Sequence, residues 1–213
     1  GAITFLAEVD ANADKVTFDR INKMEGICVF LIAGVVHIAT ADQGWGRIML
    51  YRAPNPSDLS AVGFWPRVIL NTQTVFNAQT VEAIDLGDGK ARLFCTYEGS
   101  EGTAGMDNGG VISWRYDGGN SLTKANWTEV AQCAAPGAWG TLKGAKIVDL
   151  LGDGRRLFVF GCRGTATAFR NPDGLGGIFY FDVDEGGLDT AGKTRVTIRQ
   201  TPEDVIMVDL FDL

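Results

Sequence analysis

The sequence contains few of the side chains on which metal sites and nucleophilic enzymes depend. It has one histidine, His37, in 213 residues, and its four cysteines form no Cys-x-x-Cys pair or Cys/His cluster. Zinc is therefore disfavoured, because structural zinc sites take four Cys or His ligands at short spacings. No nucleophile elbow, phosphate-binding loop followed by a helix, or His-Glu-x-x-His motif occurs. These absences exclude several common classes of enzyme.

Basic residues and long apolar runs are also scarce. The chain has 19 Lys and Arg against 26 Asp and Glu, which gives a formal net charge of −7. Nucleic acid is disfavoured as a partner because phosphate binding needs clustered basic residues, and an anionic membrane surface is disfavoured for the same reason. No apolar run approaches the ~20 residues that cross a bilayer. With 46% hydrophobic and 21% charged residues, the composition is that of a soluble globular protein.

The compartment is not determined by these features. The first residues, GAITFLAEV, lack the basic start and continuous apolar core of a signal peptide, although a mature chain would lack them anyway. Cys28, Cys95 and Cys162 lie in apolar strand patterns and are interpreted as buried free thiols. The sequon Asn126–Thr128 matters only in a secreted protein. Secretion therefore stays open, and we slightly favour an extracellular location.

The chain is organised around a repeat made of a strand, an Asp-Gly turn and a second strand. The clearest copy is Lys146–Gly161, KIVDLLGDGRRLFVFG, and an earlier copy is Glu82–Thr96, EAIDLGDGKARLFCT. A more divergent copy, which contains Asp19, precedes them, and Val205–Leu213 matches the start of a later copy. The aspartates that close the first strand recur at intervals of 66, 64 and 60 residues: Asp19, Asp85, Asp149 and Asp209.

Two further strands repeat with a similar period. A Gly-led aromatic strand follows each hairpin, at Gly46–Arg52, Gly110–Tyr116 and Gly177–Val183. A fourth strand follows a loop, at Trp65–Leu70, Trp127–Ala131 and Thr194–Arg199, and Ile3–Val9 is similar to it. β-Branched and aromatic residues fill these strands, and 28 glycines, with Asn, Asp and Pro, fill the connections between them. No segment long enough to form a helix shows helical periodicity.

Four-stranded antiparallel units repeated along a chain are typical of β-propeller blades. We therefore predict an all-β partial propeller: three complete blades, at approximately 10–70, 71–132 and 133–200, with a flanking strand at each end, the last at 204–213. Propellers usually close with at least ~4 blades. Two blade faces would stay open, so we expect either the remaining blades of a longer chain or self-association, such as a six-bladed ring of two units.

The motifs IVDLLGDGRRLFVF and AIDLGDGKARLF resemble FG-GAP or VCBS repeats, and the Trp-led fourth strand resembles blades of fungal aldos-2-ulose dehydratase. The first resemblance implies calcium in the Asp-Gly turns, with two matching carboxylates in each turn: Asp149 and Asp153, and Asp85 and Asp88. Calcium takes six to eight oxygens, and Leu stands at the other acidic positions of the family. The alternative is an Asp-capped tight turn with Gly89 or Gly154 in the left-handed conformation, which needs no cofactor.

Ligands of propellers are usually held by the connections between second and third strands and between blades. These are predicted at 34–45, 71–80, 97–109, 133–144 and 162–176. The ligand-binding candidates on this face are Trp45, Trp139, Glu98, Asp107, Arg163 and Arg170. Indoles beside glycine can stack on sugar rings while carboxylates and Arg bind hydroxyls. Alternatively, the tryptophans plug gaps between blades and the acidic residues are simply solvated. His37, in VVHIAT, is interpreted as a half-buried histidine with satisfied hydrogen bonds.

Three hypotheses for function follow. The first is a carbohydrate-recognising, lectin-like propeller segment, for which no catalytic residue is assigned. The second is a fragment of a sugar-modifying enzyme. The dehydratase resemblance implies a metal-assisted sugar lyase with histidine ligands, and one histidine cannot build that site alone. The third is a structural or protein-interaction scaffold, which predicts a partner on one face or on the open blade faces.

Overall fold

A computed structural model describes residues 23–55, 65–71, 78–97, 110–131, 142–162, 176–185 and 193–201. These residues form three four-stranded antiparallel sheets, each built from four consecutive strands. Their strands are β1 Met24–Ile32, β2 Val35–Asp42, β3 Arg47–Arg52 and β4 Arg67–Ile69; β5 Ala78–Gly87, β6 Lys90–Tyr97, β7 Gly110–Tyr116 and β8 Trp127–Ala131; and β9 Leu142–Val148, β10 Leu157–Cys162, β11 Gly176–Asp182 and β12 Val196–Thr201.

The described helical structure is a single 3-10 turn, η1 at Lys124–Asn126. No helix in the described part of the chain is long and apolar enough to span a bilayer. The all-β prediction is confirmed. The flanking strands predicted at Ile3–Val9 and 204–213 lie outside the described residues.

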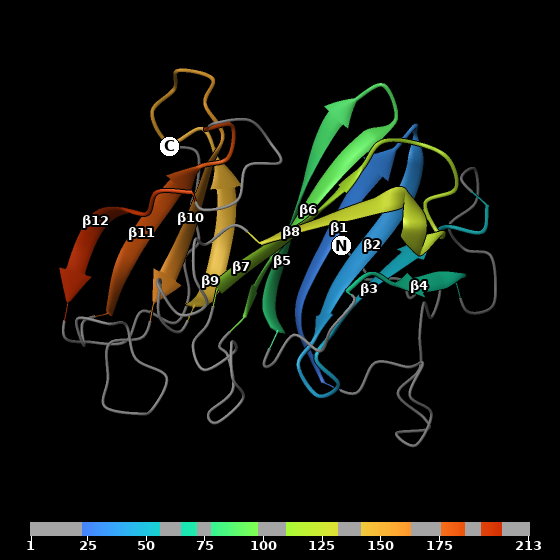
Figure 1. Cartoon of the computed structure of the whole chain (residues 1–213), viewed down its shortest axis with the longest axis horizontal. Helices are drawn as coiled ribbons and strands as arrows, with labels where there is room; N and C mark the ends of the chain where they lie inside the picture. Colours follow the sequence, from blue (N-terminus) through green and yellow to red (C-terminus); the bar gives the residue numbers. More distant parts are fainter. Residues whose placement is uncertain are drawn as a thin grey trace, which may run out of the picture.

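The three sheets are the blades of a partial propeller. They follow one another across the molecule in chain order (Figure 1), and the first strands are in contact, β1 with β5 and β5 with β9. Gly26 shows how closely β1 approaches β5, because a Cβ atom there would lie 2.5 Å from the Gln79 carbonyl oxygen. The first strand of each blade therefore lies on the inner side of the arrangement.

The hydrophobic core lies between the blades. One cluster joins the first two sheets and includes Leu50 and Trp114, and a second joins the last two sheets around Phe94, Phe158 and Phe181. The rings of Phe158 and Phe181 stack at 5.1 Å between centroids. Strand β6 contributes side chains to both clusters, since alternate residues of a strand point to opposite faces. This explains why almost every residue of β6 is buried.

The hairpin of the first blade lies further along the chain than the repeat of aspartates predicts. Ala33 and Gly34 form this turn with φ of 49° and 77°, as Asp88 and Gly89 do in the second blade with 51° and 72°. The assignment of residues 34–45 to a connection was therefore wrong, because β2 occupies most of that range. Ala-Gly supplies the left-handed turn without the aspartate that marks the other hairpins. Asp19 itself lies outside the described residues.

Strand β1 exposes apolar side chains on the face directed away from the second blade. Ile27, Val29 and Leu31 are 54%, 66% and 48% exposed. Their neighbours Cys28 and Phe30 point the other way and pack against the core between the first two sheets. Strand β1 is therefore apolar on both faces, as a strand covered on both sides would be.

Candidate functional site

The turn between β2 and β3, residues 43–46, carries the candidate Trp45. Its backbone is held by Asp42, whose Oδ1 accepts hydrogen bonds from the backbone N–H of Trp45 at 3.4 Å and of Lys23 at 3.0 Å. Gly46 closes the turn with φ of 61°, a left-handed conformation that favours glycine. The Trp45 turn is thus fixed by a buried carboxylate rather than left as a free loop.

Asp42 also forms a buried ion pair with Arg47, directly opposite it in the β2–β3 ladder. Arg47 Nη2 donates to Asp42 Oδ2 at 2.9 Å, and the two side chains are 3% and 0% exposed. The Arg47 guanidinium also lies 5.8 Å from the centroid of the Trp45 ring, within the range of a cation–π contact. The ring is therefore supported by a charged pair that solvent does not reach.

Trp45 differs from the other tryptophans that the structure describes. Trp65, Trp114 and Trp127 are buried, whereas Trp45 is half-buried. Gln43 belongs to the same turn, and its Oε1 accepts a hydrogen bond from Lys23 Nζ. The turn thus offers a partly accessible indole with hydrogen-bonding groups next to it.

The remaining ligand-binding candidates fall outside the described residues: Trp139, Glu98, Asp107, Arg163 and Arg170. They stay predictions. Lys143, from the range predicted as the loop 133–144, belongs to β9 and donates a hydrogen bond to Gln79 Oε1 of β5 at 3.2 Å. That side chain joins two blades.

The Asp-Gly turns are built as capped turns. Asp149 Oδ1 and Oδ2 accept the backbone N–H groups of Asp153 at 3.1 Å and Gly154 at 2.8 Å. Asp85 Oδ1 accepts from Gly87 N–H at 2.8 Å. Gly89 and Gly154 have φ of 72° and 84°, the left-handed conformation expected of capped turns.

This chemistry does not fit a calcium ion well. In the turn capped by Asp149, the carboxylate of Asp153 accepts hydrogen bonds from the backbone N–H and the guanidinium of Arg155. The backbone and Arg155 hydrogen bonds lower the pKa of Asp153. Across the described residues no group of three or more His, Cys, Asp or Glu is placed to hold a metal. Calcium at Asp85, Asp88, Asp149 and Asp153 therefore stays a prediction for solution experiments.

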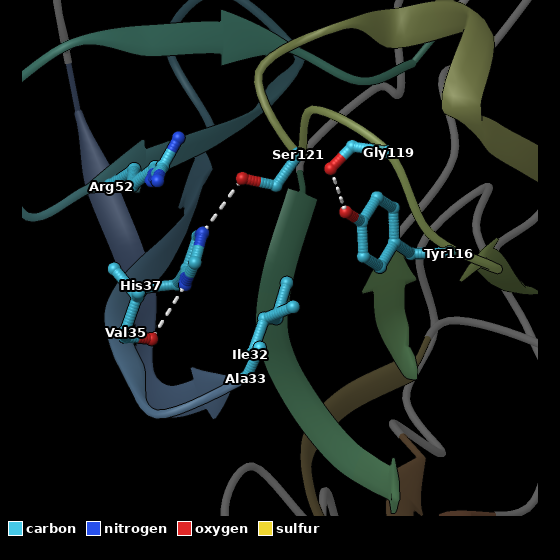
Figure 2. A pocket seen from close by; sticks show the side chains of 8 residues that line it. All are labelled: Ile32, Ala33, Val35, His37, Arg52, Tyr116, Gly119 and Ser121. Carbon is cyan, nitrogen blue, oxygen red and sulfur yellow. Dashed lines mark hydrogen bonds between the residues drawn. The ribbon is translucent and has the colours of Figure 1, made fainter. Parts of the chain in front are cut away.

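A second polar site lies between the first two blades, at the opposite end of β2 from the Trp45 turn. It is a cavity of about 100 Å³, which we call the interblade cavity (Figure 2). Its walls come from the first hairpin, from β2 and β3, and from β7 with the connection that follows it. The lining residues are Ile32, Ala33, Val35, His37, Arg52, Tyr116, Gly119 and Ser121.

His37 has both ring nitrogens in hydrogen bonds, as expected for a satisfied histidine. Nδ1 lies 2.9 Å from the Val35 carbonyl oxygen and Nε2 lies 2.8 Å from Ser121 Oγ (Figure 2). A carbonyl can only accept, so Nδ1 carries the proton and Nε2 of the neutral ring accepts from the Ser121 hydroxyl. Burial lowers the pKa of His37, and the charge of Arg52 lowers it further.

Sequence reasoning did not find Arg52, Tyr116 or Ser121. Ser121 is 84 residues away from His37 along the chain, so no local spacing connects them. Tyr116 and Arg52 end their strands and look like ordinary strand residues in the sequence. The meeting of two blades brings these groups together.

The chain matches no family model and no curated protein sequence. Among solved structures it is similar to an α-L-arabinofuranosidase from Lactobacillus brevis, with 13% identity and a TM-score of 0.45. It is also similar to a GH43_1 enzyme from Xanthomonas citri, with 12% identity and a TM-score of 0.46. The alignments cover 82% of this chain but 54% and 55% of the others, so the chain spans about half their length. The resemblances to FG-GAP or VCBS repeats and to aldos-2-ulose dehydratase stay predictions.

Proposed function

We propose that this chain is a carbohydrate-recognising segment of a β-propeller and that Trp45 is the plate on which a sugar ring stacks. The observation that supports this is the half-buried indole of Trp45, held in a glycine-flanked turn by buried Asp42. A sugar ring has an apolar C–H face that packs on an aromatic ring, and a polar rim that needs hydrogen bonds.

The surroundings of Trp45 suit this role. The Asp42–Arg47 pair fixes the turn before any ligand arrives, so little conformational entropy would be lost on binding. Gln43 lies in the same turn as Trp45, and Gln43 and Lys23 can exchange their mutual hydrogen bond for bonds to sugar hydroxyls. We include the predicted loop residues in the same proposal as further contacts with the sugar: Trp139, Glu98, Asp107, Arg163 and Arg170.

The proposal is tested by screening the chain on a glycan array and titrating each sugar found while intrinsic Trp fluorescence is recorded. We expect Trp45→Ala to weaken binding by roughly 2- to 13-fold, since an aromatic contact is worth roughly 0.5–1.5 kcal/mol. Trp45→Phe should lose less, because it keeps a ring. Leu151→Ala, an exposed substitution in the third-blade hairpin turn, serves as the control. Sugar binding that Trp45→Ala leaves unchanged would refute the role of Trp45, and an array without binding would refute the function.

The exposed face of β1 favours a second candidate, a protein-interaction scaffold. Ile27, Val29 and Leu31 form an apolar stripe on the first strand, next to the partly buried Val36 and Ile38 of β2. Such a face is what a neighbouring blade covers elsewhere in this fold. We propose that a second copy of the chain covers it, which would join two three-bladed units.

Self-association is tested by light scattering during size-exclusion chromatography at several protein concentrations. We expect a mass of two chains that Val29→Lys reduces to one, because a charge would be buried in the contact. Leu151→Lys, also on an exposed apolar residue, should leave the dimer intact. A single-chain mass at every concentration would rule out the second copy as the occupant.

A further inference from the structure

The interblade cavity contains a charge for which the described residues offer no ion-pair partner. Arg52 is half-buried in its wall. Among the residues that the structure describes, none forms an ion pair with Arg52, whereas Arg47, Arg115 and Arg156 each pair with an aspartate. A guanidinium that is partly withdrawn from water and has no carboxylate partner attracts an anion.

The cavity also contains a polar group that can serve a ligand. Figure 2 shows the guanidinium of Arg52 on the same side of the cavity as His37 and Ser121. The hydroxyl of Ser121 donates to His37 Nε2 while the ring is neutral. If His37 takes up a proton, Nε2 becomes a donor to Ser121 Oγ. The hydroxyl hydrogen is then released toward the cavity, where it can bind an anion.

The rest of the wall is apolar. Ile32 and the ring of Tyr116 face Ser121 and His37 across the cavity, and the Tyr116 hydroxyl is already used in a 2.6 Å hydrogen bond to the Gly119 carbonyl (Figure 2). Sulfate or phosphate would press charged oxygens against this wall without donors, which is costly. A carboxylate with a short alkyl part matches both the polar side of the cavity and this apolar wall.

The cavity has room for a small organic ligand. Its volume of about 100 Å³ is several times the ~10–15 Å³ that one water molecule requires, so acetate or propionate can enter. Ala33 and Gly119 are exposed at the rim, so that small molecules can enter from solvent.

We propose that the interblade cavity binds a short monocarboxylate, whose carboxylate pairs with Arg52 and accepts a hydrogen bond from Ser121 while its alkyl part packs against Ile32 and Tyr116. The proposal does not depend on sugar binding at Trp45.

Binding should be linked to protonation of His37. The groups that face His37 are Arg52 from β3, Ser121 from the connection after β7, and the ring of Phe30 from β1, with Tyr116 from β7 in the same cavity. Among them only Arg52 carries a charge at neutral pH. A bound carboxylate offsets that charge, so the pKa of His37 rises on binding and acetate binds more tightly at pH 6 than at pH 8.

The experiment uses the fact that His37 is the only histidine in the sequence. Its imidazole resonances in a ¹H–¹⁵N NMR spectrum therefore report on this cavity alone. We expect acetate and propionate to give a saturable shift at millimolar concentration. Acetamide, which has the same shape without the charge, should give none. An acetamide shift equal to that of acetate would overturn the proposal, as would a shift that does not saturate.

Three variants test which side chains bind the carboxylate. Arg52→Gln should weaken acetate binding at least tenfold, and Ser121→Ala should weaken it and reduce its pH dependence. Arg67→Gln makes the same chemical change on β4 outside the cavity, and we expect binding within twofold of the wild type. Undiminished binding by Arg52→Gln would overturn the proposal. If that variant does not fold, the comparison of acetate with acetamide on the wild-type protein still tests whether the cavity requires a negative charge.

Discussion

Replacing Asp42 by alanine should be among the most destabilising single changes in the first blade. The substitution removes the carboxylate that pairs with the Arg47 guanidinium, and Arg47 is only 3% exposed. Breaking a buried pair in this way costs about 3–5 kcal/mol. The backbone N–H groups of Lys23 and Trp45 lose their acceptor as well. Since domains are stable by about 5–15 kcal/mol, this is a large part of the total.

The assay is urea unfolding at pH 7, followed by Trp fluorescence and by circular dichroism. Asp117→Ala is the matched control, because Asp117 and its partner Arg115 lie 2.7 Å apart with side chains 51% and 28% exposed. A surface pair is worth about 0–1 kcal/mol. The double variant Asp42→Leu with Arg47→Met should recover much of the loss, since it removes the buried charge. If Asp42→Ala costs no more than Asp117→Ala, our account of the Trp45 turn is wrong.

Four further changes follow from the structure. The folded-state pKa of His37 lies below its usual 6.5, so the unfolded chain takes up the proton first. Stability should be full above about pH 6.5 and fall below it by at most ~1.4 kcal/mol per pH unit, a dependence that urea titrations of His37→Gln should lack. Gly26→Ala should lower the free energy of unfolding in urea by roughly 1–3 kcal/mol, because its Cβ would meet the backbone of β5; an unchanged midpoint would contradict this close approach. Burial raises the pKa of the Cys28 thiol to about 12 and that of Cys95 higher still, so native Cys133→Ser protein should react with a thiol reagent at pH 8 far more slowly than unfolded protein. Asp149→Ala should lower the midpoint equally in calcium and in EDTA, because the carboxylate caps a turn; a loss confined to calcium would instead support a metal there.

The sequence predicted the blades best where a local marker exists. Asp-Gly between two apolar runs marks the hairpins β5–β6 and β9–β10, because the left-handed residue and the Asx cap are properties of the turn itself. The first hairpin has Ala33 and Gly34 instead, so the aspartate marker failed although the backbone conformation is the same. The repeat of Gly-led aromatic strands was the more faithful guide to this blade.

The candidate sites could be predicted only in part, for a similar reason. Trp45 could be proposed from the sequence because its glycine neighbours mark a turn within a few residues, and its role stays a prediction. The partners that support it could not be proposed in this way, because the roles of Asp42 and Arg47 depend on the ladder between β2 and β3. The interblade cavity was invisible in the sequence, because it exists only where two sheets meet and joins residues 84 positions apart.

The β2–β3 ladder also keeps the two proposed sites apart. Asp42 pairs with Arg47 at one end of this ladder and His37 pairs with Arg52 at the other, five residues away along each strand. At about 3.3 Å per residue the two pairs are separated by roughly 17 Å. The odd number of steps also places His37 on the face toward the second blade and Asp42 on the opposite face. Effects at sites more than about 7–10 Å apart without shared partners usually add, so a change at Trp45 should leave carboxylate binding intact and a change at Arg52 should leave sugar binding intact. Each proposal can therefore fail without the other.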